Sequence, residues 1–457
     1  SSLEDLTRKV ALGRAKAPGG DEMKFSLTPA RWAALFCTVL FVLPSCASKR
    51  VAPPPEGKTF QVPWGAVPLE RWDPTVKNTF ERDIIEGLHV RLQELRKKAG
   101  GKPITLRGLA LSGGGSHGAY GAGVLIGWTD AGTRPEFDVV TGISTGALTA
   151  TAVFLGPEQD DSLRMYTRVT NKDIFKSRGP LAILTGDSMY DAAPLRALIA
   201  KQVDEGVLQA VAREHARGRR LYVGTVNLDA QAFTIWDMGL IASSDRPDKL
   251  ERYRDVILAS ASVPVLFPPV YIPLEVGGES YRQMHVDGGA REMIFFPGFI
   301  QDFDKAIAEA GLSRAEVRGE IYVLFNGRIS ARGTYEPVEP RALSVMEEFV
   351  RTLMRKSITS SIYQIWVRGL IHKMDIHITD IPAEYKDLQS DMEFNPDDMK
   401  RLFEFGYNRS VNGQAWWIQP AVDNYQELIN KLNPSEVIGE MEARPEFRRI
   451  EKWRPNE

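Results

Sequence analysis

The alternation of hydrophobic and polar positions predicts a sheet covered by helices. Apolar residues recur at helical spacing over residues 78–98, and the glycine pair at 100–101 ends that helix. From residue 104 the chain runs through an apolar strand, a glycine-rich loop and a helix, and residues 136–156 repeat that order. Consecutive units of this kind are typical of a parallel sheet with helices on its faces.

Later segments extend this pattern. Residues 343–371 carry apolar side chains at helical spacing and predict one or two amphipathic helices, which more often pack on a core than lie on a membrane. Together the elements predict an α/β fold with a central, mostly parallel sheet and a mainly helical C-terminal extension. Further strands are predicted at residues 220–227, 233–238, 283–286, 320–325 and 374–378.

The N-terminal segment has the pattern of an export signal. Lys24 and Arg31 accompany an apolar run of 12 residues, 32–43. This run is shorter than the ~20 residues that span a bilayer, but it fits the hydrophobic region of a secretory signal. The expected division of this part of the chain is residues 1–22 upstream of the fold, 23–46 as the signal, and 47–103 as a Pro-rich tether with the first helix.

The signal ends in Leu43-Pro44-Ser45-Cys46, which resembles a bacterial lipoprotein box and implies a lipid-modified Cys46. The chain would then be anchored in the bacterial cell envelope. The outer membrane is favoured over the inner membrane, because Ala47 stands where retention at the inner membrane uses Asp. The alternative is ordinary signal cleavage after Ala47, which would give a soluble periplasmic protein.

Composition and charge narrow the classes of function. The chain has 457 residues, of which 43% are hydrophobic and 25% charged, and its formal net charge is −2. These values are those of a globular protein, and the near-zero charge argues against a nucleic-acid partner. The only cysteines are Cys37 and Cys46, so we expect no disulfide framework or thiolate metal site in the body of the protein. Neither a metal nor a cofactor is expected.

Three glycine-rich motifs carry the candidate chemistry. In their order along the chain they are GGGSHG at 113–118, GISTG at 142–146 and DGG at 287–289. In the second, Gly142, Ser144 and Gly146 form the G-x-S-x-G pattern of a nucleophile elbow between a strand and a helix. Glycines are needed there because side chains would collide with neighbouring backbone. The alternative is a tight turn with an unreactive serine.

The first motif allows two interpretations. Gly113, Gly114 and Gly115 expose backbone N–H groups without side-chain obstruction, as an oxyanion hole requires. The same segment satisfies the dinucleotide-binding pattern G-x-G-x-x-G, and Asp138 lies 20 positions beyond Gly118, where that pattern expects an acid. Asp138 begins a predicted strand rather than ending one, which favours acyl transfer.

The serine needs a base, and the sequence offers two kinds. A triad in the chain order of α/β hydrolases would use His372 or His377, but neither lies in a loop with turn signals. Asp287 does lie in such a loop, because two glycines follow it. His285 would share its face of an extended strand and is interpreted as a packed or surface histidine, with a role in tuning Asp287 as the alternative.

The three motifs in this order resemble the patatin-like phospholipase family, and the likeness covers residues 104–297. The resemblance implies a three-layer α/β/α fold, with a catalytic domain at 104–328 and an extension packed on it at 329–457. His117 stands where the family usually has Arg or Lys, and it is expected to support the glycine loop as a hydrogen-bond donor or when protonated. The implied site is a Ser-Asp dyad, with Ser144 as the nucleophile, Asp287 as its base, and Gly113, Gly114 and Gly115 as the oxyanion loop.

The predicted function is therefore that of a serine acyl hydrolase of the phospholipase A type. It would cleave acyl esters of phospholipids or related lipids through an acyl-enzyme intermediate. The expected partners are the lipid ester and a membrane that holds the lipid on Cys46. A catalytically idle envelope lipoprotein that binds lipid or serves as a scaffold is the alternative, and a nucleotide-binding oxidoreductase comes third.

Overall fold

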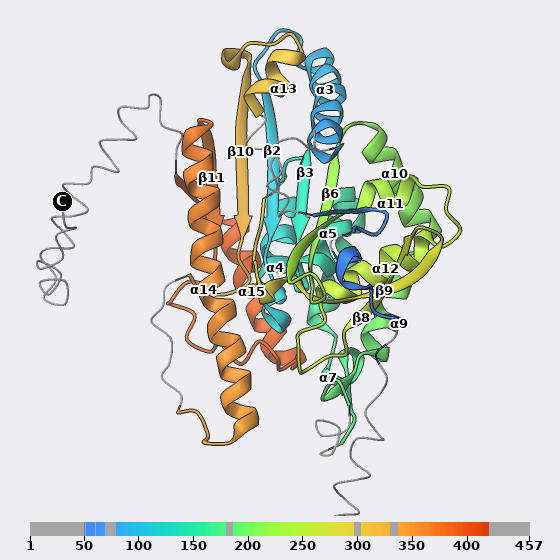
Figure 1. The fold of residues 1–457 in the computed structure, drawn as a ribbon. Coiled ribbons are helices and arrows are strands. Elements are labelled where there is room, and N and C mark those ends of the chain that lie inside the picture. The colour runs from blue at the N-terminus through green and yellow to red at the C-terminus, as the bar shows by residue number, and fades with distance from the viewer. Residues whose placement is uncertain are drawn as a thin grey trace, which may run out of the picture. The chain divides into compact units, whose positions relative to one another are not determined.

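Ten of the described strands form one sheet at the centre of the fold (Figure 1). The structure is a computed structural model, and it describes residues 50, 52–59, 61–68, 79–179, 186–296, 303–329 and 337–419. The predicted signal at 23–46, with Cys37 and Cys46, lies outside these residues. Among the helices that are described, none combines the length and the apolar character needed to cross a membrane.

The middle of the sheet is parallel and its margins are antiparallel. The strand order is β1-β7-β6-β3-β2-β10-β11-β12, and β9 pairs with both β6 and β8. Strands β6, β3, β2, β10 and β11 run parallel to one another, while β1, β7, β8, β9 and β12 each pair in the antiparallel sense. The strands are β1 (Ala66–Pro68), β2 (Ile104–Leu111), β3 (Val139–Gly142), β6 (Arg220–Asn227), β7 (Ala232–Asp237), β8 (Val270–Val276), β9 (Glu279–Asp287), β10 (Val317–Leu324), β11 (Met374–Thr379) and β12 (Trp417–Gln419).

Helices cover both faces of the sheet because alternate residues of each central strand enter different cores. On β10, Tyr322 and Leu324 pack into one core, whereas Ile321 and Val323 pack into the other. The first core is covered by α4 (Gly118–Asp130), α5 (Thr145–Leu155), α9 (Ala193–Gln202), α10 (Glu205–Ala216), α11 (Met238–Ser243), α12 (Lys249–Ser260) and α15 (Pro396–Val411). The second is covered by α3 (Thr79–Ala99), α13 (Phe303–Glu309) and α14 (Ala342–Ile371).

The structure confirms the predicted α/β class, with its mostly parallel central sheet, helices on both sides and a helical C-terminal region. The strand predicted at 220–227 is β6 with the same bounds, and 343–371 forms the single helix α14. The strand predicted at 283–286 is longer than expected and forms β9. Residues 396–411, for which the sequence pattern predicts no element, form α15.

The sheet continues beyond the expected domain boundary at residue 328. Strand β11 pairs in parallel with β10, and β12 pairs with β11. Helix α15 packs on α4, the helix that follows the first glycine motif. The C-terminal region therefore shares the sheet and the core of the residues before it.

Candidate active site

The sheet topology brings Ser144 and Asp287 together. Strand β3 pairs with the first half of β6, where Gly142 lies opposite Val223. Strand β9 approaches from the other direction and pairs with the second half, where Asp287 lies opposite Thr225. Because β7 occupies the other edge of β6 over the same residues, β3 and β9 share one edge and end facing each other. The residues that follow β3 therefore meet the end of β9.

Ser144 has the strained backbone of a nucleophile elbow. Its φ of 53° and ψ of −122° lie outside the regions that a residue with a side chain ordinarily adopts, and it directly precedes α5. A Cβ atom on Gly142 would lie 2.6 Å from the carbonyl oxygen of Gly146. A Cβ atom on Gly146 would lie 2.7 Å from the carbonyl oxygen of Ser112. Both glycines of the motif are thus required by the close approach of backbone.

A second serine holds this turn in place. Ser260, at the end of α12, accepts a hydrogen bond from the backbone N–H of Ser144 at 3.0 Å. The Ser260 hydroxyl in turn donates to the carbonyl of Gly224 on β6 at 2.7 Å. Through Ser260, the elbow is linked to β6, the strand with which β9 pairs. Ser260 is therefore a positioning residue for Ser144.

Asp287 is fully buried at the end of β9. Its Oδ1 accepts the N–H of Gly289 at 2.7 Å, and its own N–H donates to the carbonyl of Ser262. Burial raises the pKa of Asp287 to about 7, against the opposing effects of the Gly289 N–H and of the Ser144 hydroxyl. Oδ2 makes no hydrogen bond of good geometry with the described residues, so this oxygen is free to take a proton.

The glycine loop follows β2 and lies beside the elbow. The N–H of Gly113 donates to the carbonyl of Met293 at 3.1 Å and is therefore engaged. The N–H groups of Gly114 and Gly115 make no hydrogen bond within the described part of the chain. Thr145, next to Ser144, donates its hydroxyl to the carbonyl of Gly115 at 2.9 Å and also contacts the buried hydroxyl of Tyr166. The candidate oxyanion donors are thus Gly114 and Gly115, tied to the elbow through Thr145.

The C-terminal region supports this loop from behind. The N–H of Ser116 donates to the carbonyl of Asp391 at 2.8 Å, and a Cβ atom on Gly115 would collide with the same carbonyl oxygen. Nε2 of His117 lies 2.9 Å from the carbonyl oxygen of Gln389, a contact in which the ring nitrogen is the donor. His117 therefore links the loop to the backbone at 389–391 rather than facing the serine pocket.

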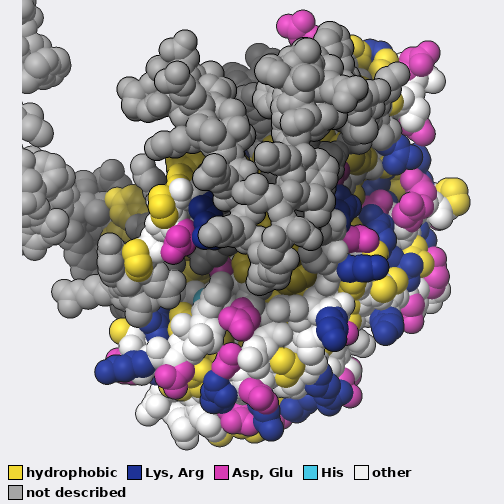
Figure 2. Space-filling model, turned by 90° about the horizontal axis from the view of Figure 1, so that it is seen from below, with side chains coloured by type: hydrophobic (Ala, Val, Ile, Leu, Met, Phe, Trp, Pro, Cys, Tyr) yellow, Lys and Arg dark blue, Asp and Glu magenta, His cyan; other side chains and the backbone are white. Residues whose placement is uncertain are grey.

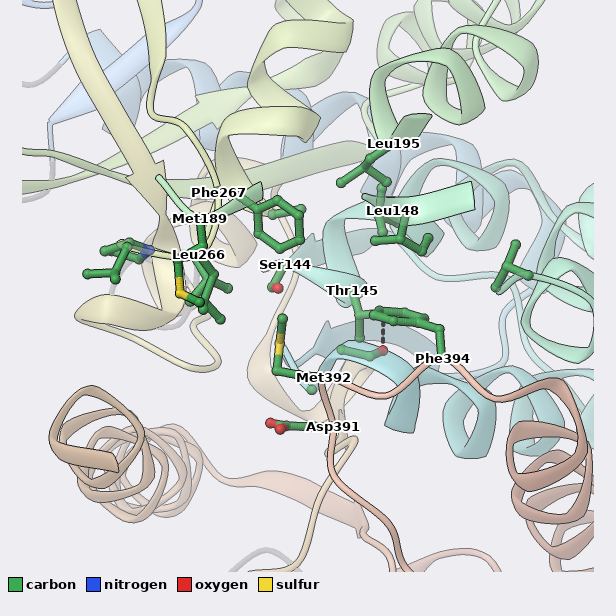
Figure 3. A pocket seen from close by; sticks show the side chains of 18 of the residues that line it. Ser144, Thr145, Leu148, Met189, Leu195, Leu266, Phe267, Asp391, Met392 and Phe394 are labelled. Carbon is green, nitrogen blue, oxygen red and sulfur yellow. Dashed lines mark hydrogen bonds between the residues drawn. The ribbon is translucent and has the colours of Figure 1, made fainter. Parts of the chain in front are cut away.

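Ser144 lies in an open apolar pocket, with about 1080 Å³ of empty space when the solvent at its mouth is counted (Figure 3). Figure 3 shows the Ser144 side chain between Phe267 on one side and Met392 on the other. Asp391 is the charged side chain among the lining residues that the structure describes. The apolar lining includes Leu148, Met165, Val169, Ile174, Met189, Leu195, Leu266, Phe267, Met293, Met346, Met392 and Phe394.

None of the three histidines considered as a base or a tuning group, His285, His372 and His377, lines the Ser144 pocket. His372 lies 3.5 Å from Asp304, and His377 stacks on Tyr322 in the sheet, so neither lines the pocket. His285 is fully buried, with Nδ1 3.0 Å from the Thr225 hydroxyl. Burial lowers the pKa of His285 to about 3, which keeps its ring neutral. The structure thus gives His285 a packing role beside Asp287.

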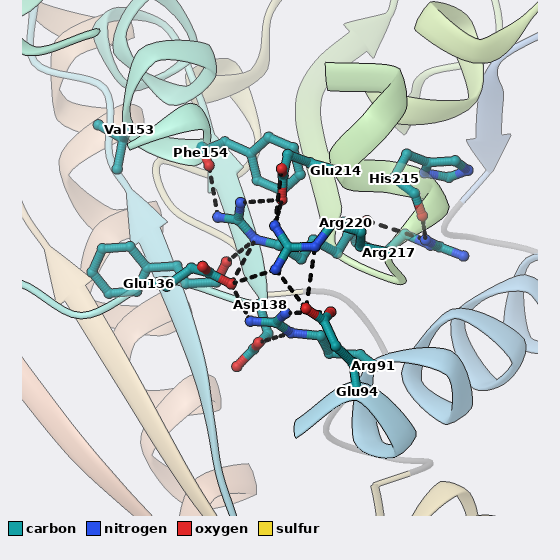
Figure 4. Close-up of polar contacts among 12 residues, drawn as sticks. Arg91, Glu94, Glu136, Asp138, Val153, Phe154, Glu214, His215, Arg217 and Arg220 are labelled. Atoms are coloured by element: carbon teal, nitrogen blue, oxygen red, sulfur yellow. Dashed lines mark hydrogen bonds and ion pairs between the residues drawn. The ribbon is translucent and has the colours of Figure 1, made fainter. Parts of the chain in front are cut away.

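The Asp138 carboxylate is bound within the protein, so it is not available as the acidic residue of a dinucleotide-binding site. It accepts hydrogen bonds from Nε of Arg91 and from the N–H of Arg107, each at 2.6 Å. Figure 4 shows Arg91 in a network of ion pairs that also includes Glu94, Glu136 and Arg217. Because β2 and β3 are parallel, this network lies at the amino ends of the strands, whereas the glycine loop lies at the carboxyl ends.

No group of three or more His, Cys, Asp and Glu side chains in the described residues is arranged to hold a metal ion. Ser260, Thr145 and Tyr166 are not among the residues predicted from the sequence, although all three position the elbow or the glycine loop. For Thr145, the sequence does offer a signal, because its hydroxyl directly follows the elbow serine. Nothing in the local sequence points to Asp391, which reaches the loop from the far end of the chain.

Comparison with known proteins identifies the domain that carries this site. Residues 109–300, less than half of the chain, match the family model described as patatin-like phospholipase, which supports lipid acyl hydrolase activity. No curated protein matches the chain. Among solved structures, VipD from Legionella pneumophila aligns with 13% identity and a TM-score of 0.28, over 69% of this chain and 68% of VipD. Human GIVD cytosolic phospholipase A2, solved with methyl gamma-linolenyl fluorophosphonate, aligns with 12% identity and a TM-score of 0.30, over 74% of this chain and 63% of its own.

Proposed function

Since residues 109–300 carry a patatin-like phospholipase domain, we propose that the chain hydrolyses acyl esters of phospholipids or related lipids with a Ser144-Asp287 dyad. One observation carries the proposal above the others. The serine on the strained elbow lines a pocket of apolar side chains, and its hydroxyl is close enough to the buried Asp287 to affect the pKa of that carboxyl. An apolar pocket with a few convergent polar groups suits an acyl chain whose ester carbonyl must reach a nucleophile.

The first half of the proposed reaction forms an acyl-enzyme. Asp287 accepts the Ser144 proton while the serine oxygen attacks the ester carbonyl. The N–H groups of Gly114 and Gly115 donate to the resulting oxyanion. When the tetrahedral intermediate collapses, the alcohol leaves with the proton that Asp287 had taken.

The second half releases the acid. Asp287 accepts a proton from water as the water oxygen attacks the acyl-enzyme carbonyl, and it returns that proton to Ser144 when the fatty acid leaves. A pKa near 7 suits both steps, because the group then accepts and donates protons at neutral pH. The buried carboxylate is shielded from bulk water. The hydrogen bond that its Oδ1 accepts from the Gly289 N–H fixes its orientation instead.

We further propose that the chain is a lipid-anchored protein of the bacterial envelope, attached through Cys46. The support is the apolar run at 32–43 followed by the lipoprotein-type box. Labelling with a radioactive or clickable fatty acid during expression tests it, because label in the unmodified chain and none in Cys46→Ser is expected. Label retained by Cys46→Ser would contradict this assignment.

The dyad is tested with separate Ser144→Ala and Asp287→Asn variants on p-nitrophenyl acyl esters. We expect each to lose activity by about 10³-fold or more, because residues of one catalytic unit fail together. Ser280→Ala, a change of an exposed serine on β9, is the matched control, and His372→Ala and His377→Ala are expected to retain activity. Reaction of the unmodified chain with a fluorophosphonate probe is the second readout. A folded chain that neither hydrolyses esters nor takes up the probe would instead support the idle scaffold.

A further inference from the structure

The first turns of α14 expose large apolar side chains. Val345 is 52% exposed, Met346 50% and Phe349 61%. Farther along the helix, Ile358 and Ile365 are buried in the core. Helix α14 is therefore anchored by its later turns, while its first turns present apolar groups to solvent. Grouped apolar exposure of this kind marks an interaction surface rather than ordinary surface composition.

This exposed face is continuous with the pocket. Helical spacing places Val345 and Phe349 on one side of α14. Met346 is turned toward the neighbouring cavity and belongs to the wall of the pocket that holds Ser144. A lipid acyl chain leaving a membrane that touches Val345 and Phe349 would meet Met346 and the apolar lining next.

A basic segment also contributes to the wall of the pocket. Residues 168–178 contain four basic residues and one acidic residue, and Val169 and Ile174 of this segment line the pocket. Lys172 and Lys176 are exposed. In Figure 1, α7 (Asn171–Ile174) and the first turns of α14 both lie at the lower end, beyond the carboxyl ends of the strands. Figure 2 looks at this end and shows hydrophobic and basic side chains on it, with acidic ones among them.

We propose that the first turns of α14 and the basic segment 168–178 form one docking surface for an anionic lipid membrane. The apolar side chains would enter the boundary between headgroups and acyl chains, and the lysines would contact anionic headgroups. This inference rests on the proposed function, because it names the surface from which the pocket takes its lipid. Ser357 holds α14 to the site by donating to the carbonyl of Arg291 and accepting the N–H of Met293.

A position-specific probe tests the docking. The full-length chain would carry Ser144→Ala, Cys37→Ser and Cys46→Ser, with an environment-sensitive fluorophore on either Phe349→Cys or Leu240→Cys. Leu240, 48% exposed on α11, is the matched control. With vesicles of phosphatidylcholine and phosphatidylglycerol, we expect a blue shift at 349 and none at 240, and a smaller shift at 349 with phosphatidylcholine alone. No shift at 349, equal shifts at both positions, or equal shifts with both vesicle types would overturn the proposal.

A second experiment connects docking to turnover. We expect Val345→Asp with Phe349→Asp to reduce hydrolysis of vesicle phosphatidylglycerol by roughly tenfold or more, and to leave hydrolysis of a water-soluble ester unchanged. Lys172→Glu with Lys176→Glu should act in the same direction, while Leu240→Asp and Lys97→Glu are the controls. An equal loss on both substrates would overturn the docking role. The fluorescence experiment uses the inactive Ser144→Ala chain, so its result does not depend on whether the protein hydrolyses esters. The proposed hydrolysis is contradicted by a different result, namely an unmodified chain that is inactive on soluble esters.

Discussion

Asp287 combines complete burial with a chemical task that needs its charged form. Burial raises its pKa to about 7, so the carboxylate is half protonated at neutral pH. Only the deprotonated form can accept the Ser144 proton. We therefore expect kcat/KM to rise with pH and to reach half its maximum near pH 7, measured on a soluble ester that does not titrate in this range. A profile that is flat from pH 5 to 9 would contradict the role of Asp287 as the base.

The same pKa predicts how stability changes with pH. The folded pKa of Asp287 lies above the unfolded value of about 3.9, so its contribution to stability is fully present below pH ~4 and is lost as pH rises through about 7. Asp287→Asn removes this titration. Relative to the unmodified chain, we expect its unfolding free energy to gain by about 3 kcal/mol between pH 5 and pH 8, as followed by urea unfolding. A constant difference between the two chains would exclude a raised pKa.

The backbone of Asp391 leaves no room for a side chain at Gly115. A Cβ atom there would collide with the Asp391 carbonyl oxygen, and its φ of 51° is strained for any other residue. Gly100 is a matched control, because its φ is 56° and nothing lies within 4 Å of the added atom. We expect Gly100→Ala to cost about 1 kcal/mol of stability and no activity. Gly115→Ala should also displace an oxyanion donor and lower kcat by about 10²- to 10³-fold. Equal effects at both positions would show that only φ matters.

At this scale the sequence predicted what is encoded locally. Gly142 is constrained by the Gly146 carbonyl and Asp287 accepts the N–H of Gly289, so this part of the pattern is visible in the chain, whereas Gly146 is constrained by the carbonyl of the distant Ser112. The partners of the glycine loop are not local. Gly113 donates to Met293 and Ser116 to Asp391, which are 180 and 275 positions farther along the chain. Only the folded backbone shows that one of the three expected N–H groups is already engaged.

Among the elements, α3 is joined to the sheet by a buried charge. Arg91 donates to Asp138 at 2.6 Å and to Glu94 at 2.8 Å, and it also pairs with Glu136 (Figure 4). We expect Arg91→Met to lower the unfolding free energy by about 3–5 kcal/mol, because it leaves the Asp138 carboxylate buried without its cation. Arg96→Met, an exposed change on the same helix, should change it by less than about 1 kcal/mol.

Urea unfolding of the two variants makes this comparison. Adding Asp138→Asn to Arg91→Met should restore part of the loss, since the uncompensated charge is then gone. Equal stability of Arg91→Met and Arg96→Met would refute a buried ion pair. From its spacing alone, Asp138 is a candidate ribose ligand, because it lies 20 positions beyond Gly118. That spacing does not show at which end of the sheet the acid lies.

In the whole molecule, the sheet joins residues on both sides of the boundary expected at 328. Strand β11 covers the edge of β10 that would otherwise be open, α15 packs on α4, and Asp391 supports the glycine loop. The predicted boundary follows the point at which the family motifs end. The pairing of β10 with β11 is a long-range contact across α14, and a local apolar pattern predicts a strand without naming its neighbour.

A chain ended after residue 328 should therefore fail to fold. It would expose the β10 edge and the apolar face of α4, and it would lack the wall of the pocket formed by Met392 and Phe394. We expect no cooperative unfolding transition by circular dichroism and no ester hydrolysis. Co-expression with residues 329–457 should recover both in part, because the missing strand and helix can then pair in trans. A 1–328 chain that unfolds cooperatively and hydrolyses esters would show that the C-terminal region is an accessory to a self-sufficient catalytic domain.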